Sequence, residues 1–422
     1  MEYTKSEVLQ YVAENDVKFI KLFFTDILGE VKSISIQPSI LENAFENGIS
    51  FDGSAVPGFL KVEQSDLFLM PDPTTLSVLP WRPTQGRVAR MYCNICYSNG
   101  KPFEGDSRLI LKNVLDKSKK LGYEIKVGTE CEFYLFKLDE NGLPTKIPHD
   151  KAGYCDLAPL DKGENVRRDI ITNLEQMGIE PQTSHHEAGP GQNEIDFKYS
   201  SAMRAADNFA TFKITVKTIA AKNGLWATFM PKPLENQSGS GLHINISIYK
   251  DGENLFATEN PESKQFIAGV LKRISEITAF LNPIQQSYKR LGAFEAPRYI
   301  SWSRQNRSQL IRIPAAKGDS VRFELRSPDP TCNQYIALAL IIAAGLEGIE
   351  NKMELAPACD KNLFEISADE IKNLGIESLP LTLENSLKLC VNSDFVKRYI
   401  PEITLQAFFN IKNQEIAKNL YS

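Results

Sequence analysis

Two glutamates that stand two residues apart could form a cation-binding face. Glu130 and Glu132 lie in Gly128-Thr-Glu-Cys-Glu-Phe-Tyr-Leu-Phe136, whose β-branched and aromatic residues predict a strand. Because side chains alternate along a strand, the two carboxylates share a face, with Cα atoms roughly 6.5–7 Å apart. Such a pair repels unless a positive charge lies beside it, and Mg²⁺ and Mn²⁺ prefer oxygen ligands of this kind. Taken alone, the segment favours two solvated glutamates on an edge strand.

Four later segments carry similar polar faces, which changes that interpretation. In residues 242–248, leucine and isoleucine alternate with His243, Asn245 and Ser247. The other alternating segments are residues 193–197, 310–314 and 321–326. Their polar positions hold Glu, Asp and Arg with almost no Lys, unlike an ordinary solvated face, so together they predict one sheet folded round a cavity. The groups expected to face this cavity are Glu130, Glu132, Glu187, Glu194, Glu324, His243, Arg290, Arg307, Arg312, Arg322 and Arg326.

This combination of carboxylates and arginines suits phosphoryl transfer. Carboxylates with one histidine can hold hard divalent cations, and arginines can bind the anion that the cations bridge. Phosphoryl transfer needs both, since negative charge spreads over oxygens in its transition state. The chain has no Gly-x-x-x-x-Gly-Lys-Ser/Thr sequence, which excludes a P-loop NTPase, and Ser238-Gly-Ser-Gly241 precedes a predicted strand rather than a helix, which argues against a dinucleotide site. A phosphotransferase acting on a guanidino substrate could use a similar face.

Composition excludes several other classes of function. The net charge of −5 shows no nucleic-acid footprint, so the arginines are expected to bind small anions. The seven cysteines, an odd number in a long chain, indicate no disulfide framework, and the lone pair Cys93 and Cys96 favours a structural role. The longest apolar run, residues 335–346, is too short to cross a bilayer, and the first six residues show no signal pattern. We therefore expect a cytoplasmic protein without nucleic-acid or membrane partners.

The elements that must position these groups divide the chain near residue 100. Residues up to about 97 predict a small α+β unit, in which Ser6 caps a first helix and residues 51–58 form a loop rich in Gly and Pro. Its other predicted elements are strands at residues 17–24, 31–36, 76–80 and 87–97 and a helix at 38–47. The turn-rich segment 98–106 predicts the boundary. Beyond it, helices alternate with short strands; they are expected at residues 107–121, 164–177, 202–223, 264–281 and 333–351, with further helical pattern from about residue 368.

Ordered motifs along nearly the whole chain carry a resemblance to a known family. They are Phe51-Asp-Gly-Ser, Ser65-Asp, the Glu-x-Glu at Glu130, Asp156-Leu-Ala-Pro, His185-His-Glu with Pro-Gly-Gln-Asn-Glu194, Gly239-Ser-Gly-Leu-His243, Asn282-Pro with Ser-Tyr-Lys-Arg-Leu291, Gln305-Asn-Arg-Ser with Ile-Arg-Ile-Pro314, and Arg322-Phe-Glu-Leu-Arg-Ser-Pro-Asp-Pro330. In these motifs the chain resembles the class I (bacterial-type) glutamine synthetases. So many motifs in one order make a chance similarity very improbable.

The resemblance implies a fold, an assembly and a reaction. The fold is α+β, with a small N-terminal β-grasp-like domain over residues 1–100 and a larger catalytic domain over 101–422 whose curved antiparallel sheet is backed by helices. The assembly is a homo-oligomeric ring, a hexamer or a dodecamer, with active sites between neighbouring subunits. The reaction is the ATP-dependent ligation of ammonia, from ammonium, to the γ-carboxylate of glutamate through γ-glutamyl phosphate, giving glutamine, ADP and phosphate. ATP is the co-substrate, and two Mg²⁺ or Mn²⁺ ions serve each site.

The resemblance also implies roles for individual residues. Glu132, Glu187 and Glu194 would hold the metal nearer glutamate, and Glu130, His243 and Glu324 the metal nearer the nucleotide phosphates. Glutamate would be bound by Glu132, Ser238, Gly239, Arg290 and Arg326, and ATP by Asn245, Ser247, Arg307, Arg312 and Arg322. The catalytic residues would be Asp52, contributed by a neighbouring subunit to the ammonium site, Glu295 in a flap over the intermediate, and Arg307.

The chain departs from the family pattern at four places near the substrate. Ser238 stands where an asparagine is usual, Gln286 replaces another asparagine, and Ala55 replaces a serine. The flap, Leu291-Gly-Ala-Phe-Glu295, is one residue shorter than usual. These differences leave two alternatives open: a γ-glutamylamide ligase that uses an amine in place of ammonia, and a catalytically weak family member with a structural or regulatory role.

Overall fold

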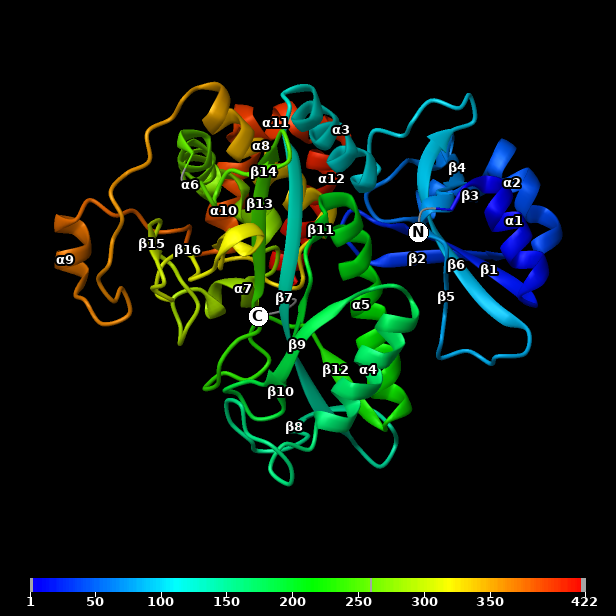
Figure 1. Cartoon of the computed structure of the whole chain (residues 1–422), viewed down its shortest axis with the longest axis horizontal. Helices are drawn as coiled ribbons and strands as arrows, with labels where there is room; N and C mark the ends of the chain where they lie inside the picture. Colours follow the sequence, from blue (N-terminus) through cyan, green and yellow to red (C-terminus); the bar gives the residue numbers. More distant parts are fainter. Residues whose placement is uncertain (1–2, 259, 419–422) are drawn as a thin grey trace.

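The N-terminal part of the chain forms a six-stranded sheet covered by two helices (Figure 1). The computed structural model describes residues 3–258 and 260–418. The strands are β1 (Val17–Thr25), β2 (Val31–Ile36), β3 (Ile49–Asp52), β4 (Asp66–Pro71), β5 (Ser77–Val78) and β6 (Arg87–Tyr97). They lie in the order β2-β1-β6-β4-β3, with β5 paired to β6, and β1 is antiparallel to β2 but parallel to β6. The helices α1 (Lys5–Glu14) and α2 (Leu41–Asn47) pack Val8, Leu41 and Phe45 into this sheet's core.

A second, eleven-stranded sheet surrounds the long strand β7 (Glu124–Leu138). The other strands are β8 (Pro144–Pro148), β9 (Pro181–His186), β10 (Gln192–Phe197), β11 (Ser200–Ser201), β12 (Leu225–Thr228), β13 (Leu242–Lys250), β14 (Glu253–Asn254), β15 (Trp302–Arg304), β16 (Ile311–Ile313) and β17 (Phe323–Leu325). The main path runs β15-β16-β17-β13-β7-β10-β9. All pairs are antiparallel except β15 with β16.

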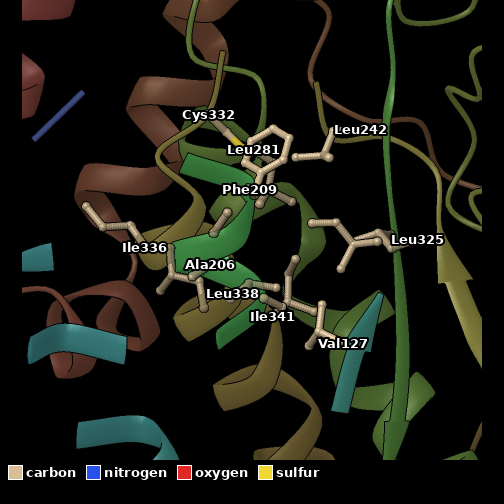
Figure 2. Close-up of a cluster of buried hydrophobic side chains, with 14 of the residues drawn as sticks. Val127, Ala206, Phe209, Leu242, Leu281, Leu325, Cys332, Ile336, Leu338 and Ile341 are labelled. Atoms are coloured by element: carbon tan, nitrogen blue, oxygen red, sulfur yellow. The ribbon is translucent and has the colours of Figure 1, made fainter. Parts of the chain in front are cut away.

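Helices cover one face of this curved sheet. The helices of this part of the chain are α3 (Ser107–Lys120), α4 (Glu164–Gln176), α5 (Ala202–Lys222), α6 (Pro261–Leu281), α7 (Gln285–Arg290), α8 (Gln334–Glu350), α9 (Ala368–Asn373), α10 (Leu383–Asn392), α11 (Asp394–Tyr399) and α12 (Glu402–Ala417), and α9 lies apart from the sheet (Figure 1). In Figure 2, Val127, Leu242 and Leu325 from three strands meet Phe209 of α5 and Ile341 of α8. The opposite face is thereby left for polar side chains.

The contact between α6 and α8 requires glycine. A Cβ atom at Gly269 would lie 2.1 Å from the carbonyl oxygen of Ala344, and one at Gly348 would lie 2.1 Å from that of Gln265. Almost the whole of α8 is buried, as expected for a helix that is apolar all round. The two helices therefore form a close-packed layer behind the sheet.

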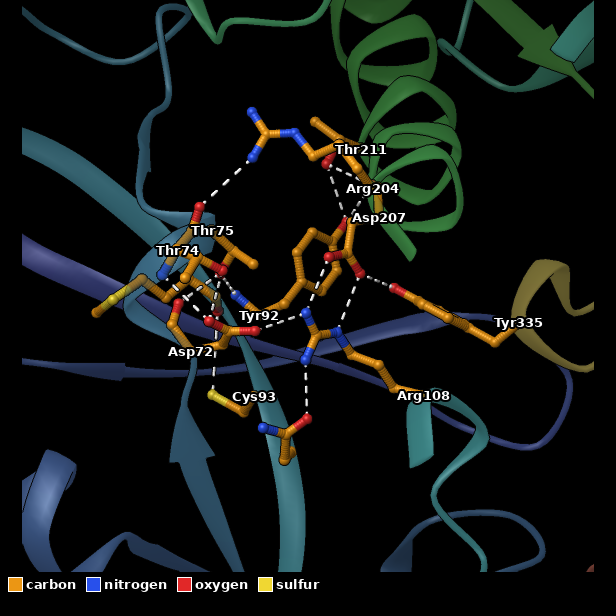
Figure 3. Close-up of polar contacts among 12 residues, drawn as sticks. Asp72, Thr74, Thr75, Tyr92, Cys93, Arg108, Arg204, Asp207, Thr211 and Tyr335 are labelled. Carbon is orange, nitrogen blue, oxygen red and sulfur yellow. Dashed lines mark hydrogen bonds and ion pairs between the residues drawn. The ribbon is translucent and has the colours of Figure 1, made fainter. Parts of the chain in front are cut away.

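A buried ion-pair network joins the two parts of the chain (Figure 3). Arg108, in the first turn of α3, donates from Nη2 to Asp72 at 2.8 Å and to Asp207 of α5 at 3.0 Å, and its Nε donates to Asp207 at 3.1 Å. The hydroxyl of Tyr335 in α8 donates to Asp207 at 2.7 Å. Buried charges are stable only when they have partners, so this network holds the segment that follows β4 against α3, α5 and α8, behind the second sheet.

The structure confirms the α+β prediction, and the five long helices begin and end within a few residues of their predicted bounds. Two local predictions were wrong. The cap of α1 is Thr4 rather than Ser6, because Thr4 forms a capping box with Glu7. The loop predicted over residues 51–58 begins too early, because Phe51 and Asp52 are the last two residues of β3. The division near residue 100 stays a prediction, supported by two sheets that share no strand. Within the described ranges, every helix is too short or too polar to cross a bilayer.

Candidate active site

The register of the second sheet brings the predicted polar side chains onto one face. Glu130 of β7 lies opposite His243 of β13, and Glu132 lies opposite Glu194 of β10. Directly opposed residues of an antiparallel pair point to the same side of the sheet. Since β7 is paired on both sides, its two glutamates are flanked by an imidazole on one side and a carboxylate on the other.

This face lines a cavity of about 620 Å³. The predicted residues in its lining are Glu130, Glu132, Glu187, Glu194, Ser238, Gly239, His243, Arg290, Glu295, Arg307, Arg312 and Arg326. Four predicted residues, Asn245, Ser247, Arg322 and Glu324, lie on or beside the same strands but outside the lining. The structure therefore gathers side chains from segments that are up to about 200 residues apart in the chain.

Glu130, His243 and Glu324 form a group that could hold a metal ion, with ligand atoms within 4.8 Å of one another. The Nδ1 atom of His243 lies 3.4 Å from a carboxylate oxygen of each glutamate. Burial raises the pKa of Glu130, but the neighbouring His243 and a 2.9 Å hydrogen bond from Asn245 bring it to about 2. Glu324 is completely buried; its Oε2 accepts from Arg312, whereas Oε1 has no hydrogen-bond partner among the described residues. A buried carboxylate oxygen without a hydrogen bond, 3.4 Å from an imidazole nitrogen and from Arg326 Nε, fits a hard divalent cation.

A second group with metal-ligand spacing consists of His185, Glu187 and Glu194. His185 Nε2 lies 2.9 Å from Glu187 Oε1. Glu132, expected with these two glutamates, lines the same cavity but is outside this 4.8 Å group. Its Oε2 instead accepts from Gln192 Nε2 at 2.9 Å, and also from the backbone of Gly241.

Burial and mutual repulsion raise the pKa values of several of these carboxyls. Burial raises the pKa of Glu194 well above its usual range, and the charges of Glu132 and Asp196 add to the effect. Burial likewise raises the pKa of Glu132, with a contribution from Glu187. A cavity that crowds this many acids favours bound cations, which relieve the repulsion.

Two buried arginines, Arg290 and Arg326, stand at the back of the cavity. Arg290 donates to the backbone carbonyls of Ser327 at 2.8 Å and of Arg326 at 3.2 Å. Arg326 donates to the carbonyl of Arg307, and its Nε lies 3.4 Å from Glu324 Oε1. Burial lowers the pKa of both guanidiniums. Because neutral carbonyls satisfy much of their hydrogen bonding, they keep positive charge available for an anionic substrate.

The remaining arginines lie nearer the predicted nucleotide side. Arg322 donates from Nε to Asn245 at 2.9 Å, and its Nη2 lies 3.8 Å from Glu130. Arg312 is bound to Glu324, and Arg307 is exposed at the cavity. Ser247 is buried on β13 two residues beyond Asn245. These positions form a basic edge next to the Glu130 group.

The loop before β13 approaches the cavity closely. A Cβ atom at Gly239 would lie 2.3 Å from the carbonyl oxygen of Pro231 and 2.9 Å from Arg290 Cγ, so only glycine fits there. The carbonyl of Ser238 accepts from the hydroxyl of Tyr134 at 2.6 Å, and that of Gly239 accepts from Gln192. This loop thus presents backbone groups to a ligand beside Arg290.

The flap over the cavity is a tight turn that ends at Glu295. Gly292 N donates to Ala296 O at 3.0 Å, and Phe294 has a φ of +54°, a left-handed conformation that is costly for a bulky residue. Lys232 lies over the Phe294 ring at 4.2 Å from its centroid. Glu295 is exposed, and its carbonyl accepts from Arg326 at 3.4 Å.

Asp52 is outside the cavity of its own chain. It ends the edge strand β3 and is exposed, and its carboxylate accepts from the backbone and hydroxyl of Ser54 at 2.8 and 2.6 Å. These hydrogen bonds lower the pKa of Asp52. A single chain therefore does not bring this residue together with the others.

Three cavity residues were missed from the sequence as candidates. Tyr154 packs edge-to-face on His185 with ring centroids 5.3 Å apart, and both line the cavity. Asp196 lies opposite Glu130 in the register. Tyr154 stands two residues before the motif Asp156-Leu-Ala-Pro, and His185 opens the motif His185-His-Glu, so both had a usable sequence signal.

Comparisons with known proteins agree over the whole chain. Residues 16–98 match the family model described as glutamine synthetase, beta-Grasp domain, and residues 104–421 match glutamine synthetase, catalytic domain. The glutamine synthetase of Clostridium saccharobutylicum is 48% identical over 404 residues, covering 94% of this chain and 91% of that protein. That of Methanosarcina mazei is 48% identical over 419 residues, covering 98% and 94%.

Solved structures show the same similarity. A GmaS complex with ADP superposes with a TM-score of 0.88 at 30% identity, covering 98% of this chain and 96% of that one. Plasmodium falciparum glutamine synthetase superposes with a TM-score of 0.87 at 27% identity, covering 100% and 98%. The chain therefore belongs to the glutamine synthetase family and is an enzyme of the glutamate–ammonia ligase class.

Proposed function

We propose that this cavity ligates ammonia to glutamate in two steps driven by ATP. A γ-carboxylate oxygen of glutamate attacks the terminal phosphorus of ATP, and ADP leaves. Ammonia then attacks the acyl carbon of γ-glutamyl phosphate, phosphate leaves, and the nitrogen loses a proton. The observation that supports this most is the meeting of Glu130, His243 and several arginines in the lining of one cavity of about 620 Å³, with the buried carboxylate of Glu324 next to Glu130 and His243.

Two divalent cations, Mg²⁺ or Mn²⁺, are the proposed cofactors. Glu130, His243 and Glu324 fit one ion, because Glu324 leaves a buried oxygen without a hydrogen-bond partner in the described part of the chain. Glu187 and Glu194, with Glu132, are proposed for the other, in the region where burial raises carboxyl pKa values. When bound, such ions neutralise the charge of the transferring phosphoryl group. His185 orients Glu187 through their 2.9 Å contact.

The remaining cavity residues are proposed to bind and orient the two substrates. Arg290 and Arg326 bind glutamate together with the loop of Ser238 and Gly239, since their buried guanidiniums keep positive charge at the back of the cavity. The ATP side is proposed to consist of Asn245, Ser247, Arg307, Arg312 and Arg322. Arg307 additionally stabilises the phosphoryl transition state from its exposed position.

The ammonium site is proposed to lie between subunits of a ring, a hexamer or a dodecamer. Asp52 is exposed on an edge strand outside its own cavity, and a lowered pKa keeps it anionic at neutral pH, so it can hold an ammonium ion. Glu295 closes the flap over γ-glutamyl phosphate and keeps water away from it.

An amine is the alternative acceptor. The solved GmaS structures at 30% identity, the serine at position 238 and the shortened flap favour it. The 48% identity to proteins named glutamine synthetase favours ammonia. The two acceptors differ in the final attack alone, so the acceptor must be tested directly.

The test measures ATP- and glutamate-dependent product formation at saturating Mg²⁺ or Mn²⁺ with ammonia, methylamine and putrescine. We expect glutamine as the main product, with the highest kcat/KM for ammonia. A higher kcat/KM for either amine would replace ammonia by the amine as the natural acceptor. Absence of turnover with all three, together with absence of γ-glutamyl phosphate trapped by hydroxylamine, would refute the catalytic proposal.

A further inference from the structure

A second cavity, of about 490 Å³, lies between the two parts of the chain. From the N-terminal part it is lined by α1, β5 and the segment up to β6, and from the C-terminal part by the end of α4 and the start of α5. None of its described lining residues lines the active-site cavity. It is therefore a separate space at the seam of the molecule.

The lining of this cavity is positively charged. Arg82, Arg87 and Arg204 all contribute to it, and no Asp or Glu is among its lining residues in the described ranges. Arg204 donates from Nη1 to the backbone carbonyl of Thr74 at 3.4 Å, a neutral partner (Figure 3). The nearby carboxylate of Asp16 interacts with Arg87 but already binds Lys18 at 2.8 Å.

A fourth guanidinium adds to this charge from behind. Arg90 is buried and contacts neutral groups, the carbonyl of Thr75 and the hydroxyl of Thr211, and it lies over the Tyr92 ring at 4.9 Å from the centroid. Burial lowers the pKa of Arg90, and the positive charge of Arg204 acts in the same direction, whereas the carboxylate of Asp207 acts in the opposite one. Asp207 already pairs with Arg108, so Arg82, Arg87 and Arg204 are the guanidiniums whose charge an anion in the cavity would compensate.

Two tyrosines in the lining also suit an oxygen-rich ligand. Tyr3 and Tyr11 line the cavity, and their rings lie 5.9 Å apart. Tyrosine hydroxyls donate to anionic oxygens, and their ring faces can pack against a flat group. Guanidiniums bind phosphate and carboxylate oxygens through paired N–H donors.

We propose that this seam cavity binds a compact small-molecule anion with at least two negative charges, held by Arg82, Arg87 and Arg204. Such an anion bridges the N-terminal sheet to the turn after α4, because Met177 and Gly178 also line the cavity. That turn leads into β9, which ends at His185 and His186 next to Glu187. The bound anion thus contacts the segment that positions one side of the active site.

The experiment titrates the full-length protein with pyrophosphate, inorganic phosphate, AMP and citrate by calorimetry, and follows the thermal unfolding midpoint with each. The test variant is Arg87→Gln with Arg204→Gln. Its matched control is Lys264→Gln with Lys272→Gln, which removes the same charge from exposed positions of α6. We expect wild type and control to bind at least one probe at the same affinity, and the test variant to bind it at least tenfold more weakly.

The ligand-free test variant should keep wild-type glutamine synthesis, because neither arginine lies in the active-site cavity. Tighter binding of AMP than of phosphate supports a ring packed on the tyrosines, and tighter binding of citrate identifies a carboxylate ligand. If the double variant fails to fold, Arg82→Gln at the exposed rim replaces it, with an expected loss of threefold or more. Equal binding by wild type and variant, or no binding of any probe, overturns the proposal.

Discussion

Glu324 shows how a single buried side chain carries information about function. One of its carboxylate oxygens has no hydrogen-bond partner among the described residues, although the residue is completely buried. Leaving such an atom unpaired costs about 1–3 kcal/mol, more when it is charged. The nitrogens nearest to this oxygen, His243 Nδ1 and Arg326 Nε, each lie 3.4 Å away without a hydrogen bond, so a cation shared with Glu130 and His243 is the partner proposed for it.

Replacing Glu324 by glutamine tests this at the level of the metal. Glu324→Gln keeps the size of the side chain but removes its charge, so we expect the Mg²⁺ or Mn²⁺ concentration for half-maximal activity to rise about 10–100-fold. The readout is metal-dependent glutamine synthesis, with Glu140→Gln in the exposed β7–β8 turn as the matched control. A wild-type metal requirement in Glu324→Gln would remove this residue from the site.

The raised pKa of Asp106 leads us to expect a measurable pH dependence of the free energy of unfolding. It caps α3, accepting from the backbone of Arg108 at 3.0 Å and of Ile95 at 3.1 Å, and burial raises its pKa to about 6. The folded state therefore binds a proton more tightly than the unfolded chain, whose pKa is near 3.8. Between pH 4 and 6 the unfolded chain holds fewer protons, so the free energy of unfolding contributed by this group falls as pH rises.

Asp106→Asn should flatten that decline. Urea unfolding of wild type and variant between pH 4 and 7 is the measurement, and the slope rather than the absolute stability is diagnostic, since the amide also weakens the cap. Asp116→Asn, exposed on the same helix, should keep the wild-type slope. A variant slope equal to that of wild type would mean that Asp106 is ionised in the folded state at pH 4.

At the scale of elements, the strands position the side chains of the site, and the helices pack against the strands and keep them in place. Leu242 and Leu325 anchor β13 and β17 in the helical layer, so His243 and Glu324 are forced to the other face (Figure 2). The alternation is imposed by the pleat, which gives adjacent residues opposite directions. A substitution that weakens packing in the helical layer should therefore lower the free energy of unfolding before it lowers the activity.

Gly269→Ala tests this layer. Its new Cβ atom would lie 2.1 Å from the carbonyl of Ala344, so α6 must move away from α8. We expect a loss of about 1–3 kcal/mol in the free energy of unfolding, by denaturant titration. Lys272→Ala, exposed on the same helix, should stay within about 0.5 kcal/mol of wild type. Full stability in Gly269→Ala would show that the two helices can separate without cost.

At the scale of the whole molecule, one chain does not complete the proposed site. Asp52 ends an edge strand of the N-terminal sheet and is absent from the cavity that its own chain forms. The network around Arg108 holds the two parts together, so a large domain rotation within one chain is disfavoured (Figure 3). If Asp52 takes part in the reaction, it must therefore be brought to the cavity by a second copy of the chain.

Mixed oligomers test this assembly. Assayed at the metal concentration that gives half-maximal wild-type activity, Asp52→Ala and Glu324→Gln subunits are each expected to be nearly inactive alone. If Asp52 acts on a neighbour's cavity, unfolding and refolding the two variants together in equal amounts should restore about a quarter of wild-type activity, because about one site in four then pairs two intact residues. The measurement is glutamine synthesis per subunit, with each variant refolded alone as the control. Activity that stays at the level of the separate variants would place both residues in one chain's site.

The local sequence pattern was sufficient to predict the five long helices and most of the candidate site residues. Alternation along residues 242–248 and 321–326 predicted which side chains share a face, and apolar spacing predicted the five long helices, because both signals depend on neighbours in the chain. Most predicted site residues consequently line one cavity. The cap at Thr4 and the start of the loop after β3 were misjudged because competing turn and cap residues are adjacent in the sequence.

Which side chains lie next to one another was decided by the tertiary structure, because the local sequence pattern holds no information about it. Strand order and register determined that Asp196 lies opposite Glu130 and that His185, rather than Glu132, joins Glu187 and Glu194 within 4.8 Å. The seam cavity with Arg82, Arg87 and Arg204 has no sequence signature, since its residues come from four separate segments. The physical reason is the same in each case: a sequence dictates the direction of a side chain relative to its own strand or helix, while only packing between elements decides what that side chain meets.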